Sequence, residues 1–178
     1  MPLAPLVKPA LFALLGLNAV AYAIFGRSTE MLDAAAWFTL LVLFELETRG
    51  PRWTRIRHNI VALVMLRLSA AGAIAWAAAG FVREHEWLDA ANAWLWIGVV
   101  MLLELEVRAP ALVARNRGTA IAAAITLYGA LAVVAAAWLM QGEWLDGYDA
   151  LLWIAAFAML ERDLLERLPG APAVLARK

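Results

Sequence analysis

Long apolar segments separated by short charged ones run the length of this chain, and they restrict its fold more than any other feature. Six such segments, at about 8–26, 33–49, 58–82, 89–107, 117–140 and 147–167, are rich in Ala and Leu and lack the alternation typical of strands. A helix of about 20 apolar residues spans the roughly 30 Å hydrocarbon core of a bilayer. With 65% hydrophobic residues in 178, the chain has more apolar surface than a soluble domain of its size can bury. The sequence therefore predicts an all-α integral membrane protein with six transmembrane helices and the lipid bilayer as its main partner.

The six segments form three copies of one two-helix unit. A Glu-x-Leu-Asp turn ends at Asp33, Asp89 and Asp146, and a glutamate follows 12 to 15 residues later in each copy. Upstream, glycines at 16, 72 and 129 share the frame, and we expect them to allow close approach between helices. A period of about 57 residues suits a helical hairpin repeat. We predict one membrane domain over 1–178, with hairpins at about 1–53, 54–112 and 113–170 and a short tail at 171–178.

Basic residues gather on one side of the expected bundle. Twelve of the fifteen lie in the termini and in the two connectors between hairpins, namely Lys8, Arg49, Arg52, Arg55, Arg57, Arg108, Arg115, Arg117, Arg162, Arg167, Arg177 and Lys178. The positive-inside rule then places both termini in the cytoplasm and the three acidic turns outside, in a cell (inner) membrane. Residues 9–25 could also be a signal peptide, but the recurrence of the same segment as a full helix favours a transmembrane span.

The acidic turns have a structural interpretation and a functional one. Asp33, Asp89 and Asp146 each precede an expected helix, where an aspartate can cap the first turn and interact with the positive end of the helix dipole. Trp87 and Trp144 lie beside two of these aspartates, at the depth of interfacial aromatic anchors. Alternatively, the turns form an acidic mouth that attracts cations. We predict that the three aspartates act as helix N-caps and that the two tryptophans act as interfacial anchors.

Three glutamates and one arginine form a candidate intramembrane polar cluster. Glu45, Glu104 and Glu161 follow the turns by roughly 18–22 Å of helix, which is short of the inner interface. Carboxylates at such depth usually face a bundle interior, a cavity or a partner. Arg67 lies about 12 Å inside another helix, and its long side chain could reach one of them. The simpler interpretation is ion pairing near the helix ends, since Glu104 and Arg108 are four residues apart.

Several functions are not expected from this sequence. It has no cysteine, neither of its two histidines has the spacing of a metal ligand, and no phosphate-binding loop or hydrolase motif occurs. The net charge of +0 gives no field for nucleic acid. We therefore expect no metal, cofactor or nucleic acid, and a non-enzymatic structural or accessory subunit of a membrane complex. A small cation or proton channel built on the glutamates is the alternative, and an enzyme acting on lipid or quinone is a third possibility. Other membrane subunits, or further copies of this chain, are the remaining candidate partners.

Overall fold

The protein is helical throughout the part that the structure, a computed structural model, describes: residues 4–48 and 60–167. Over these residues it has no strand and seven helices: α1 (Ala4–Phe25), α2 (Ser28–Thr48), α3 (Ile60–Arg83), α4 (Trp87–Arg108), α5 (Pro110–Arg115), α6 (Arg117–Gln141) and α7 (Trp144–Arg167). The all-helical prediction is confirmed. Each expected range overlaps one long helix, whereas the short α5 in the second connector was not expected.

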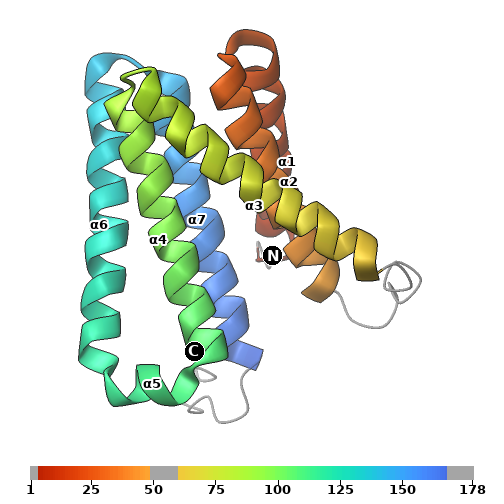
Figure 1. Ribbon diagram of the computed structural model, residues 1–178, viewed down its shortest axis with the longest axis vertical. Helices are drawn as coiled ribbons and strands as arrows, with labels where there is room; N and C mark the ends of the chain where they lie inside the picture. Colours follow the sequence, from red (N-terminus) through yellow and green to blue (C-terminus); the bar gives the residue numbers. More distant parts are fainter. Residues whose placement is uncertain (1–3, 49–59, 168–178) are drawn as a thin grey trace.

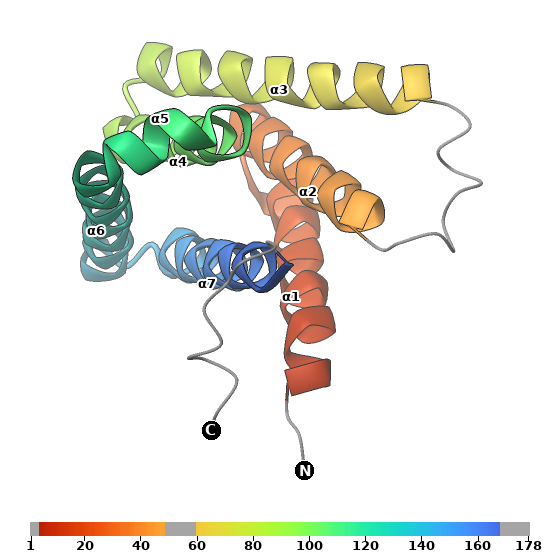
Figure 2. The ribbon, with the colours of Figure 1, turned by 90° about the horizontal axis from the view of Figure 1, so that it is seen from below.

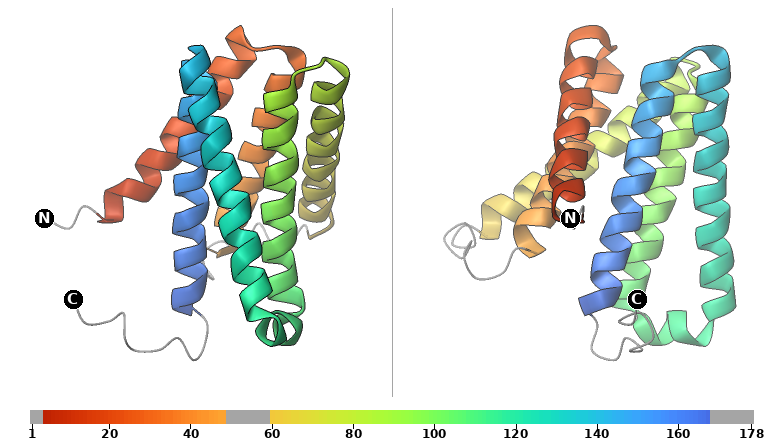
Figure 3. Two further views of the ribbon diagram at one scale, coloured as in Figure 1. Left: turned by 90° about the vertical axis from the view of Figure 1, so that its left-hand side faces the viewer. Right: turned by 180° about the vertical axis from the view of Figure 1, so that it is seen from behind.

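The long helices form a closed bundle. Each packs against the long helix that precedes it and the one that follows, and α7 returns to α1 (Figures 1 and 2). The turns α1–α2, α3–α4 and α6–α7 lie together at one end, and α5 lies at the other (Figure 3). The acidic turns are thus separated from Arg108, Arg115 and Arg117 by the length of the bundle.

Within residues 4–48 and 60–167, four helices are long and apolar enough to cross a membrane: the spans are Val7–Phe25, Val61–Arg83, Trp87–Glu106 and Arg117–Gln141. Between 17% and 22% of the residues in the most apolar part of each span are buried inside the bundle, so the large majority are at least partly exposed. This arrangement suits a lipid solvent and would be costly in water. Four apolar helices therefore suggest insertion into a membrane. The count of six spans stays a prediction.

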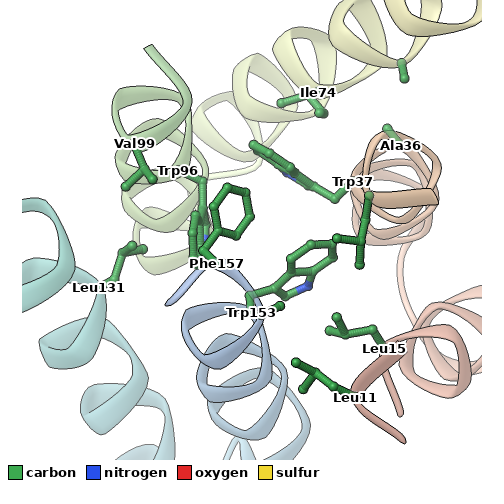
Figure 4. Packing of buried hydrophobic residues seen from close by; sticks show 13 residues of the cluster. Leu11, Leu15, Ala36, Trp37, Ile74, Trp96, Val99, Leu131, Trp153 and Phe157 are labelled. Atoms are coloured by element: carbon green, nitrogen blue, oxygen red, sulfur yellow. The ribbon is translucent and has the colours of Figure 1, made fainter. Parts of the chain in front are cut away.

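Three tryptophans fill the centre of the bundle. Trp37 of α2, Trp96 of α4 and Trp153 of α7 are all buried and pack against one another, with ring centroids 6.1–6.5 Å apart (Figure 4). These separations and tilted geometries are those preferred by aromatic pairs. We call these residues the tryptophan triad. Phe157 extends it, since its ring lies 4.7 Å from Trp96.

The glycine prediction is only partly correct. A Cβ at Gly16 would lie 3.2 Å from the Phe38 ring, but at Gly72 and Gly129 it would meet nothing within 4 Å. Tighter approaches occur at other glycines. A Cβ at Gly147 would lie 2.7 Å from the Leu139 side chain, because α6 and α7 pack closely near their turn. Of the three glycines that share the frame, only Gly16 therefore lies at a close approach between helices.

A polar pocket above the tryptophan triad as candidate functional site

A constant spacing in α2, α4 and α7 defines three tiers of side chains. An acid is followed after three residues by Asp or Asn, after four more by tryptophan, and after eight more by the predicted glutamate. The outer tier is Glu30, Asp89 and Asp146; the inner tier is Asp33, Asn92 and Asp149; and the tryptophan triad lies below. Positions i, i+3 and i+7 share one helix face, so each inner helix presents one member of every tier to the same side.

The tiers meet in a small pocket at the end of the bundle that carries the three turns. Both acidic tiers and the triad line it, together with Tyr22 of α1 and Trp138 of α6. Its cavity volume is about 40 Å³, which is room for about three water molecules. The tryptophan triad forms the floor, because Trp37, Trp96 and Trp153 also belong to the buried hydrophobic core.

The first helix closes one side of the pocket with hydrogen bonds. The Tyr22 hydroxyl donates to Oδ1 of Asp146 (2.7 Å), and Nδ2 of Asn18 donates to Oδ1 of Asp149 (2.9 Å). Both bonds join the first hairpin to the third. The tryptophan floor adds two further bonds, from the Trp153 side chain to Asp149 and from Trp37 to Asp33.

Two oxygens in the inner tier have no hydrogen-bond partner in the part of the chain that the structure describes. They are Oδ1 of Asp33 and Oδ1 of Asn92, both buried and both in residues that line the pocket. Leaving a buried acceptor unpaired costs about 1–3 kcal/mol, so most such groups in proteins find a donor. The two acceptors occupy equivalent positions on α2 and α4. This side of the pocket therefore lacks the donors that α1 supplies on the other side.

One cation lies at the rim. Arg27, between α1 and α2, forms ion pairs with Glu30, Glu86 and Asp89, the last at 3.1 Å, and lies 3.9 Å from Glu84. Partial burial lowers the pKa of Arg27, but the hydrogen bond to Glu30 and the surrounding carboxylates outweigh burial and raise the pKa overall. The guanidinium therefore stays charged and joins the first two outer turns.

The pocket holds more acid than base. Five carboxyl groups line it, and among the ion pairs of the described residues Arg27 reaches only Glu30 and Asp89 of these. Asp33, Asp146 and Asp149 depend on neutral hydrogen-bond donors. No set of three His, Asp or Glu side chains in the described part of the chain is arranged to hold a metal ion. The pocket therefore favours a positive ligand, but not one held by three close carboxylates.

The predicted N-cap role is wrong. Helix α4 begins at Trp87 with Glu86 at the cap position, so Asp89 lies within the first turn, and Asp146 holds the same place in α7. Asp33 is farther inside, because α2 already begins at Ser28. The three aspartates instead line the pocket. Glu30, rather than Asp33, is the equivalent of Asp89, since each stands seven residues before a tryptophan. The predicted alignment of Asp33 with Asp89 is therefore wrong by three residues.

The predicted anchors and the inner cluster are placed as follows. Trp87 and Trp144 are exposed beside the outer turns, and their role as anchors stays a prediction. Glu45 is buried and pairs with Lys8 of α1 at 2.8 Å.

Glu104 is exposed and pairs with Arg108, so the ion pair expected from their spacing is confirmed. Arg67 lies on the exposed first half of α3, and the side chain of Glu161 is outside the described residues. A cluster of all four stays a prediction.

The triad, Asn92 and Asp149 were not predicted from the sequence. The signal was present, since an Asp or Asn stands four residues before a tryptophan and twelve before each predicted glutamate. Comparison with known protein families, curated proteins and solved structures finds no match, so the pocket is interpreted from its own geometry.

Proposed function

We propose that this chain is a multi-pass inner-membrane protein with six spanning helices and cytoplasmic termini, and that it acts as a non-enzymatic accessory subunit of a membrane complex. The observation that carries this proposal is the combination of a filled centre and apolar outer faces. The tryptophan triad occupies the middle of the bundle, while large apolar side chains of α3 and α6 point outward. A bundle of this kind offers surface to neighbours rather than a cavity for chemistry.

The first half of α3 is the surface that best fits a partner subunit. Apart from Leu63, every residue from Val61 to Ser69 is exposed, whereas Ile74, Ala77 and Phe81 in the second half are buried. In Figure 2 this half of α3 extends beyond the other long helices of the bundle. Helices in lipid associate through packing and polar contacts, so an extended apolar helix offers a site for another membrane helix.

The topology can be tested by cysteine labelling, because the chain contains no cysteine of its own. Single cysteines at Glu143 in an outer turn and at Arg115 in α5 are treated with a membrane-impermeant maleimide on intact spheroplasts. We expect Glu143→Cys to be labelled at once and Arg115→Cys only after permeabilisation. The reverse pattern would overturn the orientation, and labelling of both from one side would overturn the span count.

The accessory role can be tested by photo-crosslinking in native membranes. A photoreactive residue replaces Leu68 on α3, and a matched control replaces Val133 on α6; both side chains are highly exposed within apolar spans. We expect a single dominant protein adduct from position 68 and only lipid adducts from position 133. Lipid adducts alone at both positions would exclude a subunit docked on α3.

A cation or proton channel is the second candidate, favoured by the acidic pocket at the outer end. The floor of this pocket opposes conduction, because the triad packs across the bundle centre. Flux into proteoliposomes decides between the two roles. The triple change Glu45→Gln, Glu104→Gln and Glu161→Gln should abolish flux in a channel, whereas an accessory subunit shows no flux before or after it.

A further inference from the structure

The pocket above the triad has the features of a binding site for a small ammonium ion. Its inner tier presents two buried acceptors without donors, Oδ1 of Asp33 and Oδ1 of Asn92. Its walls carry five carboxyl groups against one guanidinium at the rim. A ligand that satisfies both features brings N–H donors and positive charge together.

The floor of the pocket points to the same chemistry. Trp37, Trp96, Trp138 and Trp153 all line the pocket, and among aromatic side chains tryptophan attracts cations most strongly. Aromatic side chains recur in the walls of sites that bind organic ammonium groups. An alkali or divalent metal ion would instead need several close oxygen ligands, and the described residues hold no such set of acidic side chains.

The size of the cavity limits the ligand. About 40 Å³ admits about three water-sized groups, which suits ammonium or methylammonium. Tetramethylammonium is larger and has no N–H group to donate to Asp33 or Asn92. We propose that this pocket binds ammonium or a short primary alkylammonium ion, held by Asp33 and Asn92 above the tryptophan triad.

Binding of a cation would also reduce the electrostatic repulsion among the carboxylates of the pocket. Carboxylates that share a poorly solvated pocket repel one another even when they are too far apart to bind one metal ion together, and a bound cation offsets that repulsion. The two α1 donors, Asn18 and Tyr22, bond to α7, and among the described residues Oδ1 of Asp33 and Oδ1 of Asn92 receive no hydrogen bond. We therefore place the ammonium group nearest Asp33 and Asn92.

The test is a titration of the purified full-length chain in lipid nanodiscs with methylammonium chloride. Tryptophan fluorescence reports on the site, because four of the nine tryptophans line the pocket. Sodium chloride and tetramethylammonium chloride at the same ionic strength are the ligand controls. We expect a saturable change with methylammonium and ammonium, and none with either control salt.

Three variants locate the site. Asp33→Asn keeps the size of the side chain and should weaken binding at least tenfold, and Asn92→Leu, which changes no charge, should weaken it severalfold. Glu143→Gln is the matched control, since Glu143 is an exposed acid of the third outer turn that does not line the pocket; we expect a change of less than twofold. Asp33→Asn should fold at least as stably as the parent, because it removes one of five neighbouring carboxylates.

Three outcomes would overturn the proposal. The first is the absence of a saturable signal in the parent chain, which would leave water or protons as the occupants. The second is an equal response to sodium or tetramethylammonium, and the third is equal weakening by Glu143→Gln and Asp33→Asn. The inference goes beyond the accessory role and does not depend on it, so a failed titration leaves the labelling and crosslinking results unaffected.

Discussion

Replacing Trp96 with alanine should be the most damaging single change in the bundle. Its side chain is 4% exposed, and its ring lies 4.7 Å from Phe157, 6.4 Å from Trp37, and 6.5 Å from Trp153 and Tyr128. Aromatic pairs contribute about 0.5–1.5 kcal/mol each beyond burial, so four of them bound the loss at roughly 2–6 kcal/mol. Truncating a buried tryptophan in a protein core costs about 3–5 kcal/mol.

We expect a loss of about 3 kcal/mol, because in lipid the packing contacts remain but the hydrophobic contribution of a water-exposed unfolded state is reduced. The free energy of unfolding is measured in mixed micelles by titration with SDS, followed by circular dichroism. Trp94→Ala is the matched control on the same helix: Trp94 is 56% exposed, so its loss should cost less than about 1 kcal/mol. Equal costs for the two variants would refute the central role of the triad.

Three further predictions concern contacts away from the triad. Arg27→Gln should lower the free energy of unfolding by about 1 kcal/mol or less, because the ion pairs of Arg27 are partly exposed. Salt screens such pairs, so the difference in melting temperature between this variant and the parent should be smaller at about 1 M salt than at about 20 mM. A difference that persists at high salt would contradict an electrostatic origin. Lys8→Met should cost about 1–3 kcal/mol, since it leaves the buried Glu45 without its ammonium partner, and adding Glu45→Gln should restore part of the loss in a double-mutant cycle. Gly147→Ala should destabilise by about 1–3 kcal/mol through overpacking, whereas Gly72→Ala, with open space at its Cβ, should be neutral or stabilising by up to about 1 kcal/mol in thermal melts.

The helices could be predicted from the sequence because their signals are local. Long apolar runs predict helices and suggest a membrane environment, and the Glu104–Arg108 pair follows from a spacing of one helical turn. The pairing of Lys8 with Glu45 could not be foreseen in this way. It joins two helices of the first hairpin, and their relative rotation depends on packing that the local pattern does not determine.

The pocket was missed for a different reason. An aspartate near the start of an apolar helix has a sufficient local explanation as a cap, and that explanation accounted for Asp33, Asp89 and Asp146 one at a time. The structure shows that α2 begins five residues before Asp33, which places this carboxylate inside the helix and in need of another role. Aligning the repeats on tryptophan rather than on aspartate would have revealed the two tiers from spacing alone.

The surrounding helices break the approximate threefold pattern of the pocket, and this asymmetry argues for one binding position rather than three. When the three hairpins are aligned on Gly16, Gly72 and Gly129, Asn18 and Tyr22 of α1 fall at positions that are apolar in α3 and α6. These apolar residues are Ile74, Ala78, Leu131 and Ala135. Donors therefore reach Asp146 and Asp149 from α1, whereas among the described residues Oδ1 of Asp33 and Oδ1 of Asn92 receive no hydrogen bond. A symmetric ring of carboxylates would suit a passing ion equally on all sides. A pocket with donors on one side and open acceptors on the other instead holds one small donor cation in one orientation, which suits binding better than conduction.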